Sequence, residues 1–304
     1  FAGAIERAGA PVWHVWHDHQ PLTPRVDFLD AEGRLVEEGD DAREAYEAVV
    51  TGDPLEWARP DAWRATFARY FGAVERVVAP TEAAADRARR IAPAERVVVE
   101  PHPEPDLAKV RPIRGGRRGR GDVLRVGVVG AIGIHKGADL LTAMAIDADA
   151  RGLPIRFELV GYSSSKALAN NPLVTVHGKY ETDAEGIGLL RSVRPDVVFA
   201  ASVWPETWLF TLSMAFALHL PVVAFDLGAQ GERVGAYGRG HLLDAILRED
   251  PVAVNDALLG LDLERLWSAP ATVSASRTTS IGALGRDGDP VRIAAPAPAD
   301  DLVA

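Results

Sequence analysis

Between Val123 and Asp226, short apolar runs alternate with segments of helical spacing, and this alternation restricts the fold more than any other feature of the chain. The runs "VLRVGVVG", "IRFELVGY", "PDVVFAAS" and "PVVAFD" consist largely of Val, Ile, Leu and Phe. Strands that are buried on both faces have this composition, and they occur in parallel sheets covered by helices. Segments of helical periodicity, such as "KGADLLTAMAIDADARG" and "TDAEGIGLLRSV", separate them. The pattern predicts an α/β fold with a doubly wound, Rossmann-like parallel sheet.

The N-terminal third repeats the alternation in a shorter form. Strands are expected in "APVWHVWHD", "RVVAP" and "ERVVVEPHP", and helices in "RPDAWRATFARYFGAVE" and "TEAAADRARRIA", the second beginning at Thr81 as N-cap. Pro, Gly and Arg then dominate a linker, and Asp, Pro and Ala dominate the end of the chain. We therefore expect a partial α/β domain over 1–105, a linker over 106–122, a second domain over 123–285 and a loose tail over 286–304.

Composition narrows the classes of function. The chain has 304 residues, no cysteine and a formal net charge of −10. An acidic chain is a poor partner for nucleic acid, and a chain without cysteine has neither disulfides nor thiolate metal sites. We expect a cytoplasmic protein, because a reducing compartment fits this composition and no signal-peptide pattern is visible.

The longest apolar run, from Trp208 to Phe225, is the one candidate for a membrane span. It contains Thr211, Ser213, His219 and Pro221, and the proline divides it into a helix and a strand. We interpret it as protein core and expect no integral membrane segment.

The loop "GVVGAIGIHKG" follows the first strand of the second domain. It matches neither the dinucleotide-binding fingerprint nor the Walker A motif. Its glycines allow a tight turn with open N–H groups, and Lys136 stands at a helix start, which together favour an anion such as phosphate. The alternative is that Lys136 is an exposed lysine in an ordinary turn.

Glu206 follows the strand "VVFAAS" and opens the apolar segment "ETWLFTLSMAFALH", which we expect to be a buried helix. A carboxylate in a first helical turn interacts favourably with the helix dipole, so Glu206 is either a cap or a ligand for sugar hydroxyls. Because the carboxyl ends of parallel strands share one edge of a sheet, Glu206 is expected to face the same crevice as Lys136.

The ordered series "VGAIGIHKGADLL", "FELVGY", "VTVHGKY" and "PDVVFAASVWPETWLFTLSMAFALHLPVVAFDLGAQGERV" resembles the donor-binding domain of glycosyltransferase family 4. The resemblance extends over about 123–234 and is weaker in "HDHQPLTPRVDFLDAEGR" and "VVVEPHPE". It implies a GT-B-like fold, in which two Rossmann-like domains face each other across a cleft, and a retaining, metal-independent transferase without a cofactor.

The resemblance also implies roles for individual residues. Lys136 would hold the donor diphosphate, Glu206 would contact the donor sugar, and His17, with Asp18 beside it, would face the sugar across the cleft. The alternative is that His17, a lone histidine after a strand, has only a structural role. The expected catalytic residues are thus His17, Lys136 and Glu206, and the expected donor-binding residues are Gly133, Ile134, Lys136, Glu206, Phe210, Thr211, Leu212 and Met214.

Several positions depart from the family pattern. Met214 stands in place of the second glutamate, a ribose ligand, so that an acid restored there is expected to strengthen nucleotide binding. Ala131 stands where many members have an arginine, and His219 where a glycine is common. The 16 residues before His17 are too few for a complete N-terminal domain of this family, so we expect that domain to be partial.

The function expected from these features is transfer of a hexose from a UDP- or GDP-sugar to a glycan, lipid or small-molecule acceptor. Two alternatives remain. One is a catalytically degenerate relative that binds a sugar nucleotide or acts as an interaction module, and the other is a different GT-B enzyme such as an epimerase.

Overall fold

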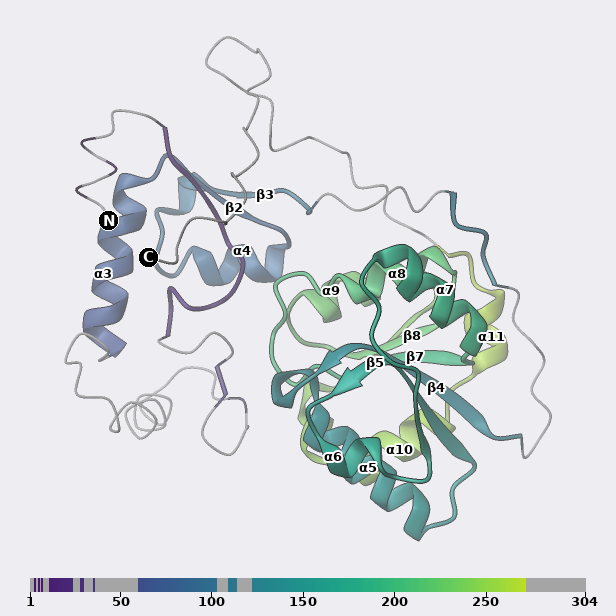
Figure 1. The fold of residues 1–304 in the computed structure, drawn as a ribbon. Coiled ribbons are helices and arrows are strands. Elements are labelled where there is room, and N and C mark those ends of the chain that lie inside the picture. Colours follow the sequence, from purple (N-terminus) through teal and green to yellow (C-terminus); the bar gives the residue numbers. More distant parts are fainter. Residues whose placement is uncertain are drawn as a thin grey trace, which may run out of the picture.

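The computed structural model describes residues 3, 5, 7, 11–23, 28, 29, 35, 60–102, 109–113 and 122–271. These residues form two α/β units, each built on its own parallel sheet (Figure 1). The predicted α/β class with a doubly wound parallel sheet is confirmed.

The N-terminal unit has a three-stranded parallel sheet in the order β1-β2-β3. Its elements are β1 (Trp13–Val15), α3 (Pro60–Ala73), β2 (Arg76–Ala79), α4 (Glu82–Ala88), the 3-10 turn η2 (Ala94–Arg96) and β3 (Val97–Val99). Thr81 caps α4 as predicted, because its side chain accepts a hydrogen bond from Ala84 N. The core of the unit includes Trp16 and Phe71, which are fully buried with their rings stacked at 5.8 Å.

The C-terminal unit has a six-stranded parallel sheet in the order β6-β5-β4-β7-β8-β9. Its strands are β4 (Leu124–Ile132), β5 (Ile155–Ser163), β6 (Val174–Val176), β7 (Val197–Ala200), β8 (Val222–Phe225) and β9 (Gly240–Leu243). The chain runs outward in one direction from β4 to β6 and then returns to continue from β7 to β9. The point where this direction reverses, between β4 and β7, is where open α/β sheets bind ligands.

Helices cover both faces of the larger sheet (Figure 1). The elements that connect and cover the strands are η4 (Ile134–Lys136), α5 (Ala138–Ala150), α6 (Lys166–Ala169), α7 (Asp183–Val193), α8 (Thr211–Ala217), α9 (Gly228–Gly235), η5 (Ala245–Glu249), α10 (Pro251–Leu259) and α11 (Leu263–Ser268). One cluster of buried side chains lies between the sheet and α5, α6 and α10, and a second lies between the sheet and α7, α8 and α9. The inner strands β4, β5, β7 and β8 are therefore largely buried on both faces, as their continuous apolar sequences predict, whereas the edge strand β6 is partly exposed.

The helix predicted to begin at Glu206 is shorter than expected. α8 begins at Thr211, and the residues from Ala201 to Phe210 form an irregular loop. Leu209 has a left-handed backbone with φ of 63°, which a helix cannot contain. At the other end His219, with φ of 55°, turns the chain toward Pro221 and β8. A left-handed residue commonly ends a helix and is usually glycine, so the histidine at this position departs from the common pattern.

The expected linker is only partly described. Within 109–113, Val110 and Ile113 pack against the core beside α8, and Ile113 N donates to Leu218 O at 2.9 Å. This part of the linker is attached to the C-terminal unit through Val110 and Ile113, while Lys109, Arg111 and Pro112 are exposed. The tail expected over 286–304 lies outside the described residues.

Two neighbouring residues in the N-terminal third pack into different cores. Phe28 belongs to the core of the N-terminal unit, whereas Leu29 is buried at 1% exposure in the core beside α5 and α10. Phe28 has a left-handed backbone with φ of 56°. An antiparallel bridge joins Leu29 to Leu35, which packs against both cores.

The apolar run from Trp208 to Phe225 forms the buried α8 and β8, which confirms the interpretation as core. None of the helices in the described ranges has the length and apolar character needed to cross a bilayer.

Candidate functional site

The loop after β4 carries Lys136 on a single 3-10 turn. Gly133 precedes this turn, and its carbonyl accepts hydrogen bonds from Lys136 N and Ala138 N, both at 3.0 Å. These bonds use amides that the sequence had suggested were open. The side chain of Ile134 is 53% exposed and lines a cavity beside Leu140 and Arg248.

Gly137 fixes the position of this turn against the sheet. Its φ is 82°, and a Cβ on it would lie 2.2 Å from the carbonyl oxygen of Ala201, just beyond β7. Only glycine combines this conformation with so close an approach. The loops after β4 and β7 are thereby pressed together, with Lys136 at their junction.

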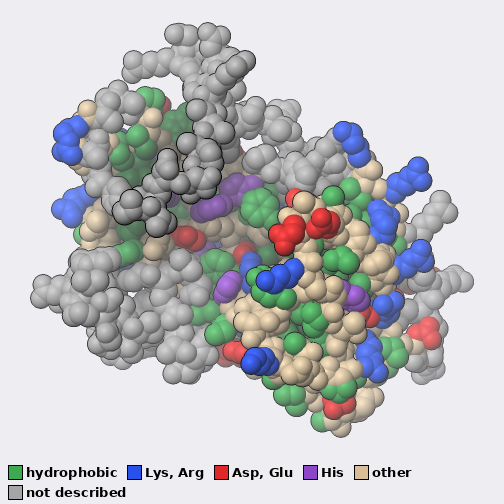
Figure 2. Space-filling view, viewed as in Figure 1, with side chains coloured by type: hydrophobic (Ala, Val, Ile, Leu, Met, Phe, Trp, Pro, Cys, Tyr) green, Lys and Arg blue, Asp and Glu red, His purple; other side chains and the backbone are tan. Residues whose placement is uncertain are grey.

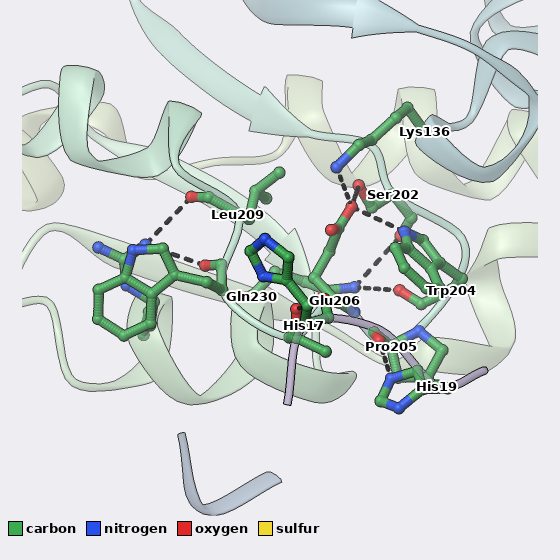
Figure 3. A network of polar contacts seen from close by, with 12 residues as sticks. His17, His19, Lys136, Ser202, Trp204, Pro205, Glu206, Leu209 and Gln230 are labelled. Atoms are coloured by element: carbon green, nitrogen blue, oxygen red, sulfur yellow. Dashed lines mark hydrogen bonds and ion pairs between the residues drawn. The ribbon is translucent and has the colours of Figure 1, made fainter. Parts of the chain in front are cut away.

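Glu206 is the centre of a polar network in the loop after β7 (Figure 3). One carboxylate oxygen, Oε1, accepts hydrogen bonds from Lys136 Nζ at 2.5 Å, Ser202 Oγ at 2.6 Å and Trp204 Nε1 at 2.8 Å. Glu206 is 5% exposed and Lys136 24% exposed. The dipole-capping alternative does not hold, because Glu206 lies before α8 and not in its first turn. Within the described part of the chain, no donor contacts the second oxygen, Oε2, which leaves it able to accept from a ligand.

The backbone of this loop is held by the start of α9. Gln230 is fully buried; its Oε1 accepts from Glu206 N at 3.0 Å, and its Nε2 donates to Trp204 O at 2.8 Å. Ala229 N donates to Glu206 O at 2.8 Å. Gly228 lies so close to Pro205 that a Cβ added to Gly228 would lie 2.6 Å from Pro205 Cα. Both the carboxylate and the peptide groups of Glu206 are therefore fixed by partners.

The start of α8 supplies open amides near Lys136. Among the described residues, no acceptor contacts the N–H groups of Phe210 and Thr211, whereas Leu212 N donates to Leu209 O at 3.1 Å. Of the three amides expected to meet the ligand, two are thus open and that of Leu212 is used inside the protein. A narrow crevice lined by Lys136, Ser202 and Thr211 leads toward them.

Arg233 of α9 holds the strained turn before α8. Its guanidinium donates to the carbonyls of Trp208 at 2.9 Å and Leu209 at 3.1 Å, and it lies over the Trp208 ring at 3.8 Å. Backbone strain persists where the surroundings over-determine it, and such strain is concentrated at functional sites.

Met214 belongs to the core and not to an open surface. It is 4% exposed, and a Cβ on Gly186 of α7 would lie 2.9 Å from its sulfur and 3.1 Å from the Tyr180 ring. The position expected to contact ribose therefore lies in the core, against which Tyr180 packs.

His17 lies two residues after the end of β1 and approaches the site from the N-terminal unit (Figure 3). Its side chain is exposed, and its ring lies edge-on to that of His102 at 5.7 Å. His102 in turn stacks on Phe210 at 5.4 Å. Figure 2 shows histidine side chains gathered in the hollow between the two units. Asp18 has a local role, since its Oδ1 accepts from Gln20 N at 2.9 Å and closes the turn after β1.

A second open space adjoins the site at the carboxyl ends of β4, β5 and β6. This cavity of about 340 Å³ is lined by Gly130, Ala131, Gly161, Tyr162, Lys179, Tyr180 and Glu181. Lys179 Nζ lies over the Tyr162 ring at 4.5 Å. An aromatic ring, a cation and a carboxylate around one hollow can recognise a planar polar group.

Sequence reasoning missed several of these residues. Ser202 and Trp204 stand just before Glu206, but nothing local shows that they point back at its carboxylate. Gln230 follows β8, and the carboxyl-edge rule for parallel sheets would have nominated it together with Lys179 and Tyr180 after β6.

Comparisons with known proteins give a similarity in structure only. No protein-family model matches the chain, and no match to it was found among the curated proteins. Among solved structures, HepE from Anabaena in complex with UDP and glucose matches with a TM-score of 0.54 and 17% identity, over 88% of this chain and 66% of that chain. HepE in complex with UDP-glucose matches at 0.52 and 16%, over 88% and 67%. OtsA without ligand matches at 0.52 and 11%, over 88% and 64%.

At these identities the similarity establishes the fold alone. This chain spans about two thirds of the length of the HepE chain. The two facing parallel-sheet units of the chain thus have a Rossmann-like, GT-B-type arrangement.

Proposed function

We propose that this chain is a glycosyltransferase that takes a hexose from a nucleotide-diphosphate sugar, a UDP- or GDP-sugar, and transfers it to an acceptor hydroxyl with retention of configuration. The observation that carries the proposal is the Lys136–Glu206 pair at the point where the strand order reverses, with the open amides of Phe210 and Thr211 beside it. The cation and the amides suit phosphate oxygens, and the open Glu206 Oε2 suits a sugar hydroxyl. HepE, which shares the fold, holds UDP and glucose.

In the proposed reaction the bond between the sugar C1 and the diphosphate oxygen breaks, and a bond from C1 to the acceptor oxygen forms on the same face. The proton of the acceptor hydroxyl passes to the departing diphosphate oxygen. Negative charge grows on the diphosphate as the bond breaks, and Lys136 with the Phe210 and Thr211 amides would stabilise it. Glu206 would orient the sugar, and His17 would face it across the cleft. As part of the same proposal, the family 4 resemblance implies a metal-independent enzyme, and the composition a cytoplasmic one.

The nucleoside would occupy the cavity beside Tyr162, Lys179 and Tyr180, since that cavity lies at the same edge of the sheet. Ala131 brings no cation to this cavity, and Met214 brings no carboxylate to the ribose. These losses favour one alternative, a sugar-nucleotide binder without turnover.

Calorimetric titration with UDP, GDP, UDP-glucose and uridine tests the proposal. We expect a sugar nucleotide to bind, and Lys136→Ala to weaken binding of the nucleotide diphosphate about tenfold to a hundredfold while leaving uridine unaffected, because a charge-assisted hydrogen bond is lost. Lys166→Ala, at an exposed lysine on α6 of the same unit, is the matched control.

Glu206→Gln distinguishes recognition of the sugar from recognition of the nucleotide. It should weaken UDP-glucose more than UDP, because only the sugar meets the carboxylate. Binding without hydrolysis or transfer of the sugar would favour the alternative, and failure of every nucleotide to bind would refute both.

A further inference from the structure

The N-terminal unit forms hydrogen bonds with the residues on both sides of Glu206, that is, with Pro205 before it and Thr207 after it. His19 Nε2 lies 2.7 Å from Pro205 O, on the side before Glu206. On the side after it, Thr207 Oγ1 donates to His17 O at 2.8 Å and Thr207 O accepts from Thr81 Oγ1 at 3.3 Å. The Glu206 side chain points away from these contacts, toward Lys136 of the C-terminal unit (Figure 3).

The hydrogen-bond pattern around His19 fixes its tautomer. Trp16 Nε1, which can only donate, lies 3.4 Å from His19 Nδ1, so Nδ1 must be the acceptor. The proton of the neutral ring is therefore on Nε2, where it donates to Pro205 O. Burial, together with the nearby Arg87 and Arg90, lowers the pKa of His19 to about 3 although the hydrogen bond to Pro205 O raises it, so the ring stays neutral at physiological pH.

Packing leaves His19 little freedom to move. The side chain is fully buried, and its ring lies 4.9 Å from that of Phe28 and 5.7 Å from that of Trp204. Trp204 is also a donor to the Glu206 carboxylate. His19 thus touches the loop at two points, the Trp204 ring and the Pro205 carbonyl, and each is within two residues of Glu206.

We propose that His19 is a positioning residue for Glu206, through which docking of the N-terminal unit sets where the carboxylate stands. If the proposed function holds, recognition of the donor sugar therefore depends on the docked N-terminal unit. The nucleotide, held by the C-terminal unit alone, is outside this dependence.

The test compares three variants with the wild type. His19→Phe keeps a buried ring and removes both nitrogens, whereas His19→Gln retains an N–H that can reach the Pro205 carbonyl. His14→Phe is the matched control, because His14 lies on β1 of the same unit and its hydrogen bond and ring contacts among the described residues, with Tyr70, Phe71 and Trp16, all lie within that unit. Hydrogen exchange of the peptide covering 202–210 reports on the loop without any ligand, and calorimetry gives the affinities for UDP-glucose and UDP.

We expect His19→Phe to speed exchange in 202–210 and to weaken UDP-glucose about tenfold with UDP nearly unchanged, as for loss of one buried hydrogen bond. His19→Gln should restore both readouts, and His14→Phe should alter neither. If His19→Phe does not fold, Thr207→Val removes the second attachment and should produce the same selective loss.

Unchanged exchange in 202–210, or an equal loss of UDP-glucose and UDP affinity, overturns the positioning role. A wild type that binds no nucleotide, with the exchange effect still specific to His19, refutes the proposed function and leaves the attachment of the loop to the N-terminal unit established.

Discussion

Lys136 Nζ and Glu206 Oε1 lie 2.5 Å apart, although the two residues are 70 positions apart in the sequence. Each follows one of the two adjacent central strands, β4 and β7, so the sheet brings them together. The pair is largely withdrawn from water, and each partner compensates for the burial of the other.

A double-mutant cycle should therefore show strong coupling in stability. Lys136→Met and Glu206→Gln alone are each expected to lower the free energy of unfolding by about 1–3 kcal/mol, because the remaining partner loses a buried hydrogen-bonded contact. The double variant should lose less than the sum of the two. Urea denaturation of the four proteins measures the coupling, and additive losses would show that the two side chains do not stabilise each other.

Gly137→Ala should damage both the fold and the anion site. The left-handed backbone and the approach to Ala201 O leave no room for a methyl group, so we expect a loss of about 2–4 kcal/mol in unfolding free energy. UDP affinity should fall as well, because Lys136 precedes this glycine. Gly188→Ala is the control: Gly188 lies on α7 with nothing within 4 Å of an added Cβ. That variant should gain up to about 1 kcal/mol from helix propensity.

Met214→Glu is expected to destabilise the protein without strengthening nucleotide binding. The sequence pattern alone suggests the opposite, but Met214 packs against α7 in the core, and a carboxylate buried there costs about 3 kcal/mol or more. Met214→Leu should cost less than about 1.5 kcal/mol, because it nearly conserves volume. Thermal unfolding and UDP titration decide the question. A well-folded Met214→Glu protein with tighter UDP binding would show that the side chain at 214 reaches the ligand.

Acid should destabilise the protein before its carboxylates titrate. His19 has a pKa of about 3 in the fold against 6.5 when unfolded, so the unfolded chain binds more protons as the pH falls below 6.5. The contribution of His19 to stability is complete at pH 7, falls by about 2 kcal/mol by pH 5, and continues to fall toward pH 3. Burial also lowers the pKa values of His14, His102, His219 and His241, which adds to the loss.

The charged groups that act on His19 are Arg87 and Arg90, and both oppose its protonation. Urea denaturation of His19→Gln between pH 7 and pH 5 should show a loss smaller than that of the wild type by about 2 kcal/mol. Identical losses in the two proteins would mean that His19 is not the group that titrates.

The inner strands β4, β5, β7 and β8 of the larger sheet were predictable because they lie in apolar runs whose burial needs no partner to be identified in advance, unlike the short edge strand β9. The start of α8 was not. The apolar pattern extends from Glu206 to His219, but α8 begins only at Thr211. The helix is kept from starting earlier by the left-handed Leu209 and by Arg233, which donates to the carbonyls of Trp208 and Leu209. Tertiary contacts here override local propensity.

The same limit applies to the site. The edge rule for parallel sheets brings Lys136 near Glu206, since it depends only on strand order. The donors Ser202 and Trp204, and the Gln230 clamp, depend on how an irregular loop folds back on itself. The contact of His19 with Pro205 joins residues 186 positions apart in two different units, and no pattern in the sequence records it.

The division of Phe28 and Leu29 between two cores bears on which fragments of the chain can fold alone. The boundary between the sheets lies near residue 122, but the six-stranded unit completes its interior with a leucine from far upstream. A fragment that starts near residue 122 would have a void where Leu29 packs, and a void of that size costs about 2–5 kcal/mol. We therefore expect the two sheets to unfold together in one cooperative transition, with their border in the sequence marking no border in stability.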